Sequence, residues 1–247
     1  MKIPSLIIAL VAAVVFAAQL STPILAETLV LNNATAPPLT NDDKTGFIDI
    51  VVGEAFRRVG LELKLIKLPS ERALKNANDG IEDGDVNRIA GLEKLYPNLI
   101  RVPEKNYDMK FVAFTRNPAF EIDGWQSLKP YIVGLIKGWK IFEKNIPAGT
   151  DMIYAHDPEQ LFTMLEKGRI DIALYSRLMG LDIVKRRQLT GVTILSPPLA
   201  TREMFLYLHN RHKDLVPLIA NALAAVKSEG LYDVEFKKIE ARYDSLK

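Results

Sequence analysis

The sequence has no cysteine, which excludes disulfides, thiolate metal sites, cysteine nucleophiles and the lipid-modified cysteine of exported lipoproteins. Its three histidines, His156, His209 and His212, show no metal-ligand spacing, and no G-x-S-x-G sequence is present. The formal net charge is only +2 and no dense basic stripe occurs, so no nucleic-acid partner is expected. The sequence therefore predicts no catalytic residue, no metal site and no cofactor.

Residues 1–26 have the pattern of a cleavable secretory signal. Lys2 supplies the charge of its first part, residues 6–18 form an apolar run, and Ala26 follows a polar break as the expected cleavage point. The alternative is a membrane anchor, since residues 3–20 approach the roughly 18 apolar residues that can begin to span a bilayer. The polar break favours cleavage, so we expect an exported protein that is released from the membrane.

The remaining chain alternates strands and helices in two series, which predicts an α/β protein with two lobes. The first series has strands at 29–31, 61–65 and after Gly80, with helices at 45–60 and 70–78. After a strand at 110–115, the second series has strands at 131–136, 152–154, 170–174 and 192–195, with helices after Gly138, at 158–167 and up to about Arg187. A strand at 204–208 and helices at 214–229 and 231–243 follow, and this tail is expected to pack on the first lobe.

The stretch GIEDGDVNRIAGLEK, residues 80–94, resembles a calcium loop because Asp83, Asp85 and Asn87 alternate in it. A calcium loop needs Gly at its sixth position and Glu at its twelfth, and these positions hold Arg88 and Lys94. A cation at the twelfth position would repel the metal, so we interpret the stretch as a strand that leaves the first lobe toward a cleft. The pattern G-x-x-D recurs at Gly168 and Asp171, and both aspartates are expected to hold a helix-to-strand turn.

The order of elements and motifs resembles the family 3 periplasmic solute-binding proteins, of the amino-acid-binding type, over the whole chain after the signal. The motifs are the Pro pair at 37–38, the helix start at Thr45, Gly46, Phe47 and Asp49, the two G-x-x-D strands, V-P-E-x-x-Y at 102–107, the segment from Ser127 to Gly138, EKGRIDIALYSR at 166–177 and SEGLYDVEFKKI at 228–239.

This resemblance implies the two-lobed periplasmic binding protein fold, in which each lobe is a central sheet flanked by helices and two strands form a hinge. It places the first lobe at 27–115 and 203–247 and the second at 116–202, with hinge crossings near 115–124 and 196–202. It also implies a periplasmic monomer without enzymatic activity, which delivers a small-molecule ligand to an ABC-type inner-membrane permease or to a membrane sensor.

The sequence departs from the family at the ligand site. Where relatives that bind α-amino acids have a carboxylate-clamping Thr-x-x-Arg, this chain has residues 89–92, IAGL. Where they have an acid for the ligand's ammonium group, it has Tyr175 and Ser176, and Trp139 replaces a small hydroxyl residue. The resemblance therefore favours a small polar ligand that is anionic or amino-acid-like, and it does not supply a partner for an ammonium group.

Eight residues are the candidate ligand contacts. Arg88 could clamp an anion at the strand exit, or form an ion pair with Asp83 or Asp85. The others are an arginine at a helix start, three residues of a strand-to-helix turn, and side chains at strand ends: Arg72, Tyr107, Lys137, Gly138, Trp139, Tyr175 and Ser176. A cleft enzyme of the dehydratase or lyase type, and a sensor partner with little or no ligand, remain as alternatives because fold does not fix function.

Overall fold

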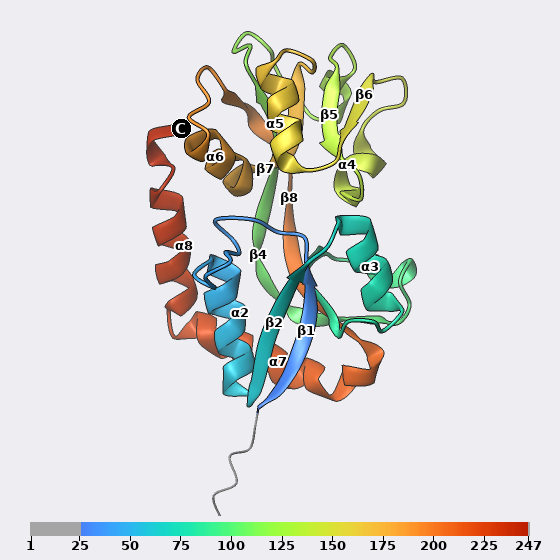
Figure 1. Ribbon diagram of the computed structural model, residues 1–247, viewed down its shortest axis with the longest axis vertical. Coiled ribbons are helices and arrows are strands. Elements are labelled where there is room, and N and C mark those ends of the chain that lie inside the picture. The colour runs from blue at the N-terminus through green and yellow to red at the C-terminus, as the bar shows by residue number, and fades with distance from the viewer. Residues whose placement is uncertain (1–25, 247) are drawn as a thin grey trace, which may run out of the picture.

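The computed structural model describes residues 26–246, which form an α/β fold with one eight-stranded sheet in the order β2-β1-β3-β8-β4-β7-β5-β6 (Figure 1). The first part of the chain forms β1 (Glu27–Asn33), α2 (Phe47–Arg58), β2 (Leu61–Lys67), α3 (Ser70–Asn78), β3 (Gly84–Ile89), η1 (Leu92–Lys94) and β4 (Leu99–Thr115). The second part forms η2 (Trp125–Leu128), β5 (Val133–Ile136), α4 (Lys140–Asn145), β6 (Met152–Ala155), α5 (Pro158–Glu166), β7 (Ile172–Ser176), α6 (Arg177–Arg186), β8 (Thr193–His209), η3 (Asn210–Leu215), α7 (Val216–Ser228), α8 (Leu231–Ala241) and η4 (Asp244–Leu246). The α/β class that the sequence predicts is confirmed.

Two long antiparallel strands connect the two halves of the molecule. β4 and β8 have 17 residues each and pair from Leu99 opposite His209 to Thr115 opposite Thr193. In Figure 1 they run from the half that contains β1, β2 and β3 into the half that contains β5, β6 and β7. Within the described residues, β4 pairs with β7 over residues 111–115. The division of the chain into lobes stays a prediction.

β8 is one strand, whereas the sequence predicts two strands separated by Pro197 and Pro198. In the β4–β8 pairing Phe111 lies opposite Ala200 and Ala113 lies opposite Leu195, so residues 196–199 form a bulge. Proline has no N–H to donate to a ladder, and a bulge does not need one. The prolines therefore interrupt the pairing locally without ending the strand.

The two G-x-x-D motifs perform the same structural task in the two lobes. Asp83 accepts a hydrogen bond from Val30 N at 2.7 Å through its carboxylate, and its own N–H donates to Val30 O at 2.8 Å. Asp171 makes the same two contacts with Ile132, both at 2.8 Å. Each aspartate thus ties the chain before its strand to the neighbouring strand, which confirms the structural role that the sequence predicts.

The C-terminal helix contacts both lobes, where the sequence predicts packing on the first lobe alone. α8 packs on α2 and α7, and Figure 1 shows it rising along them toward α6. Beyond its end, Tyr243 Oη donates to Asp182 Oδ1 of α6 at 2.9 Å, and Lys185 Nζ donates to Arg242 O at 2.8 Å. The helix is about 16 Å long, and residues at and beyond its end contact α6.

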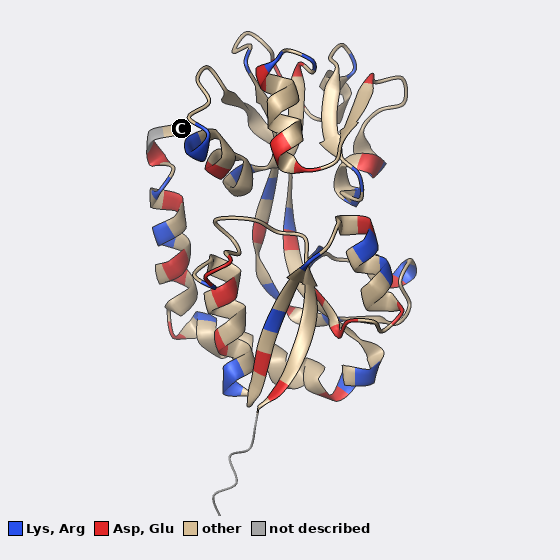
Figure 2. Ribbon diagram, in the orientation of Figure 1, with Lys and Arg blue, Asp and Glu red and all other residues tan. Residues whose placement is uncertain are grey.

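Charged residues of both signs are mixed over the two halves of the ribbon (Figure 2). Within residues 26–246 no helix has the length and apolar character needed to cross a membrane. The predicted signal peptide, apart from Ala26, lies outside the described residues.

Candidate functional site

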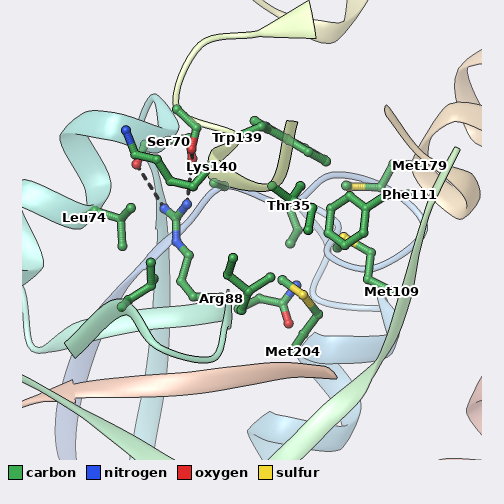
Figure 3. Close-up of a pocket in the computed structure, with 16 residues that line it drawn as sticks. Thr35, Ser70, Leu74, Arg88, Met109, Phe111, Trp139, Lys140, Met179 and Met204 are labelled. Carbon is green, nitrogen blue, oxygen red and sulfur yellow. Dashed lines mark hydrogen bonds between the residues drawn. The ribbon is translucent and has the colours of Figure 1, made fainter. Parts of the chain in front are cut away.

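A cavity of about 60 Å³ lies between the two halves, next to the hinge strands (Figure 3). The first half contributes the segment after β1, the start of α3 and the end of β3, and the second half contributes the turn between β5 and α4. Its lining residues are Ala34, Thr35, Ser70, Leu74, Asn87, Arg88, Ile89, Leu92, Met109, Phe111, Gly138, Trp139, Lys140, Ile141, Met179 and Met204.

These segments converge because of the strand directions. β1 and β3 are parallel neighbours, and β5 is parallel to both β6 and β7. The carboxyl ends of parallel strands meet at one edge of a sheet, where the loops form ligand crevices. Thr35 follows the end of β1, Arg88 lies in the last part of β3, and Gly138 follows β5. The location of the cavity is therefore the one that the topology favours.

Arg88 is buried at 7% exposure, and its charge is compensated within the first lobe. Its Nη2 lies 2.7 Å from Oδ2 of the fully buried Asp85. Nη1 donates to Ser70 Oγ at 2.6 Å and Nη2 to Ser70 O at 3.1 Å, while Nε has no hydrogen-bond partner within residues 26–246. Of the two alternatives for Arg88, the ion pair with Asp85 is present, and Nε is one N–H that has no partner in the described part of the chain.

The other polar residues of the 80–94 stretch also have protein partners. Asn87 Oδ1 accepts from Asn106 Nδ2 at 3.1 Å, and Asn87 Nδ2 lies 3.5 Å from Tyr107 Oη. Asp83 is bonded to Val30, Arg211 and His212. A buried hydrogen-bond network therefore accounts for the alternating polar side chains that resemble a calcium loop.

The opposite end of the cavity is apolar and rich in sulfur. Met109, Met179 and Phe111 lie together at one end of Figure 3, away from the guanidinium of Arg88, and Met204 lies below them. Methionine side chains are flexible and polarizable, so this wall can adapt to an apolar group of variable shape. The cavity thus has one polar end and one adaptable apolar end.

Trp139 forms a wall of the cavity through an aromatic stack. Its ring is parallel to that of Phe142 within 6°, with the centroids 5.7 Å apart, and lies 4.8 Å from the ring of Tyr175. It also meets Phe111 edge-on at 6.1 Å. Trp139 is half-buried. Its neighbours Phe142 and Tyr175 belong to the second lobe, and Phe111 belongs to the hinge strand β4.

The two lobes touch directly at Gly138. Its carbonyl accepts a hydrogen bond from Ser70 Oγ at 3.2 Å, and Gly138 has φ of +90°. A Cβ atom at this position would lie 2.8 Å from Glu71 N, closer than the packing permits. Lys140 Nζ, also from the second lobe, lies 2.6 Å from Glu71 Oε2.

The Lys137–Gly138 turn supplies two of the predicted contacts, a backbone N–H that already has a partner and a side chain outside the cavity. The Gly138 N–H already donates to Glu143 Oε1 at 2.7 Å, and α4 behind it has only six residues. Lys137 is exposed and does not line the cavity. Lys140, one turn further, is the lysine that does line it.

The remaining predicted contacts lie outside the lining of this cavity. Arg72 is exposed on α3, outside the cavity lining. Tyr107 and Tyr175 are both 1% exposed, and burial raises the pKa of each phenol. Tyr175 lies behind Trp139 and lines an adjoining hollow of about 440 Å³, which also includes Thr35, Ser70, Trp139 and Met179. Ser176 is turned away from the cleft and lines a different cavity.

Of the eight predicted contacts, the cavity thus brings together Arg88, Gly138 and Trp139. Sequence reasoning missed Lys140 and the methionines, because single methionines in strands and helices give no pattern that distinguishes a site from a core. Among the described residues that line the cavity, none carries a carboxylate, and two carry a cation. Residues 26–246 also contain no group of three side chains placed to hold a metal ion.

Comparison with known proteins supports the fold more than the family. No protein-family model matches the chain. A relative from Shewanella oneidensis, described as an uncharacterized protein, is 27% identical over 205 residues, which cover 79% of this chain and 76% of the relative.

Solved structures match over most of the chain. A mutant of ArgBP from T. maritima has a TM-score of 0.73 at 19% identity, covering 87% of this chain and 95% of that one. A histidine kinase sensor domain with similarity to periplasmic binding proteins has a TM-score of 0.74 at 17% identity, covering 88% and 96%. The chain has the type II periplasmic binding fold.

A third structure extends this likeness to a transporter component. The amino acid ABC transporter substrate-binding protein AbpA from Streptococcus pneumoniae, bound to L-arginine, has a TM-score of 0.71 at 15% identity. The match covers 88% of this chain and 96% of that one. The two-lobed architecture that the motifs indicate is therefore confirmed for this type II fold.

Proposed function

We propose that this protein is a solute-binding protein that captures a small ligand between its two lobes. The observation that carries the proposal is the cavity itself, because both lobes and both hinge strands supply its walls. Closure of two lobes around a ligand is the usual mechanism of proteins with this architecture. The three similar structures, two binding proteins and a sensor domain, support a binding role and not an enzymatic one.

The lining favours a ligand with an anionic group and an apolar body. The cationic groups are Lys140, which pairs with Glu71 and Glu143, and Arg88, whose Nε has no partner within residues 26–246. Among the described lining residues, none carries a carboxylate to receive an ammonium group. The methionine cluster and Trp139 would cover the apolar part. An anion without an ammonium group fits this arrangement better than an ordinary α-amino acid does, and the ligand class remains anionic or amino-acid-like.

The location and partners belong to the same proposal. We place the protein in the periplasm as a monomer, exported by residues 1–26, where it presents its ligand to an ABC-type permease or a membrane sensor. The likeness to AbpA supports the first partner and the likeness to the kinase sensor domain supports the second.

A thermal-shift screen of the purified protein tests the proposal. The ligands are aromatic acids, dicarboxylates, phosphorylated compounds and ordinary amino acids. A ligand at about 100 times its Kd stabilises the native state by about 2.7 kcal/mol, which for a chain of this size raises Tm by about 5–10 °C. We expect a hit among anions that lack an ammonium group.

Two variants on one helix test whether the stabilising compound binds in the cleft cavity. Lys140→Gln should reduce the shift, and Lys144→Gln, which changes an exposed lysine of α4, should not. No stabilisation by any compound would favour a sensor partner with little or no ligand. Conversion of the bound compound over several hours, instead of its recovery intact, would favour the cleft enzyme.

A further inference from the structure

A second cavity, of about 270 Å³, lies at the edge of the hinge strand β4, outside the cleft. β7 pairs with β4 only as far as Ser176 opposite Phe111. The preceding residues of β4, 107–110, pair with β8 alone, so their other edge is free. Tyr232 and Glu240 of α8 close the cavity on the outside, and α6 and α8 lie on the same side of the hinge in Figure 1.

The start of α6 supplies the polar end of this cavity. Ser176, Arg177 and Leu178, the N-cap and first two residues of the ten-residue helix, all line it. The N-terminus of a helix attracts anions through its free N–H groups and its dipole. Ser176 does not cap the helix with its side chain, and at 1% exposure its Oγ has no hydrogen-bond partner within residues 26–246.

A buried hydroxyl without a hydrogen-bond partner is unfavourable, so a ligand that bonds Ser176 would remove this cost. The cations beside it are also available. The nearest acid to Arg177 is Glu240, with 3.7 Å between Nη1 and Oε1, which is longer than a hydrogen bond. Lys110 lines the cavity and makes no ion pair within the described residues.

The rest of the lining defines the size and shape of the occupant. Tyr232 and Phe236 of α8 are stacked within 8° with their centroids 5.7 Å apart, and Leu178 faces the same space. Asp108 also lines the cavity, but Lys105 neutralises it at 2.9 Å. The walls thus suit a flat apolar group, next to an end that suits one negative charge.

We propose that this cavity binds a small carboxylate with an aromatic or similarly flat apolar body. The carboxylate would pair with the Arg177 guanidinium at the start of α6, and Arg177 would exchange its long contact with Glu240 for the ligand. Rotation of the Ser176 side chain, whose Oγ is shielded in this structure, would let that hydroxyl donate to the carboxylate as well. The apolar body would lie against Tyr232 and Phe236. Among the described residues, the linings of this cavity and of the cleft cavity share Met109 alone, so the two sites are separate.

Titration calorimetry of the whole protein with benzoate tests this site. Benzoate should bind, and Arg177→Gln should lower the affinity for benzoate at least about tenfold because a charge-assisted pair is lost. Arg169→Gln, which changes an exposed arginine of the same lobe, is the matched control and should have no effect. Glu240→Gln should tighten binding about threefold, since it removes the competing carboxylate; a purely structural role of Arg177 predicts no tightening.

Three results would overturn the proposal. The first is no benzoate binding at millimolar concentration, and the second is binding that Arg177→Gln leaves unchanged. The third is equal binding of inorganic phosphate, which has no apolar body. Loss of binding in Lys140→Gln but not in Arg177→Gln would place benzoate in the cleft alone, which would remove the second site and leave the proposed function intact.

Discussion

An added methyl group at Gly138 should weaken closure of the two lobes without preventing the lobes from folding. Gly138 belongs to the second lobe, and a Cβ at 138 would meet Glu71 N at 2.8 Å and Ser70 Cβ at 3.1 Å, both in the first lobe. Backbone cannot move aside as a flexible side chain can, so Gly138→Ala should hold the lobes apart. Overpacking of this kind costs about 1–3 kcal/mol.

This cost falls on the closed form alone, because the contact exists only when the lobes meet. A loss of about 1–3 kcal/mol in the closed form lowers the apparent affinity for a cleft ligand by about 5-fold to 150-fold. We expect Gly138→Ala to show a larger radius of gyration in small-angle X-ray scattering, and a lower affinity for the cleft ligand in titration calorimetry.

Gly149→Ala is the matched control for backbone strain. Gly149 also lies in the second lobe with a positive φ, +83° against +90° at Gly138, but a Cβ there would meet nothing within 4 Å. Both variants should lose about 1 kcal/mol of stability from the left-handed conformation. An unchanged scattering profile and affinity in Gly138→Ala, or equal changes in both variants, would refute the reasoning.

Three further predictions concern charged groups. Arg88→Ala leaves the carboxylate of Asp85 buried without its cation, so urea denaturation should show a loss of about 3–5 kcal/mol, and a loss below 1 kcal/mol would contradict the importance of the pair. Glu71→Gln removes the half-exposed contact with Lys140 between the lobes, so ligand affinity should fall by at most about fivefold at low salt, with no difference from wild type near 1 M salt. Burial raises the pKa of Asp83, but hydrogen bonds from a backbone N–H, an arginine and a histidine outweigh it and leave the pKa below its usual 3.8. Its contribution to stability is therefore present above pH 3.8 and is lost as the pH falls through the lowered pKa, so Asp83→Asn should show a weaker dependence of Tm on pH in the acid range than wild type does.

Local patterns in the sequence were sufficient for most of the elements. The helix over 70–78 has the predicted bounds, and the helix predicted from 45 to 60 is observed at Phe47–Arg58. The helical and strand periodicities depend on which residues face a core, and this information is present within each short segment. The two hinge strands differ from the prediction. β4 begins at Leu99, whereas the sequence predicts its strand from residue 110. In β8, the signal of two prolines does not reveal whether they end a strand or occupy a bulge in it.

The sequence alone determined the α/β class, the two series of elements and the strand exits where a cleft forms, because hydrophobic periodicity and turn residues encode them locally. Only the tertiary structure decided which side chains face that cleft. Arg88 is bound by Asp85 and Ser70. Lys140, and not the predicted Lys137, lines the cleft cavity, while Ser176 lines the cavity on the other side of the hinge strand. These outcomes depend on the register of paired strands and on contacts between residues distant in the chain, and a one-residue change of register reverses the face of every side chain in a strand.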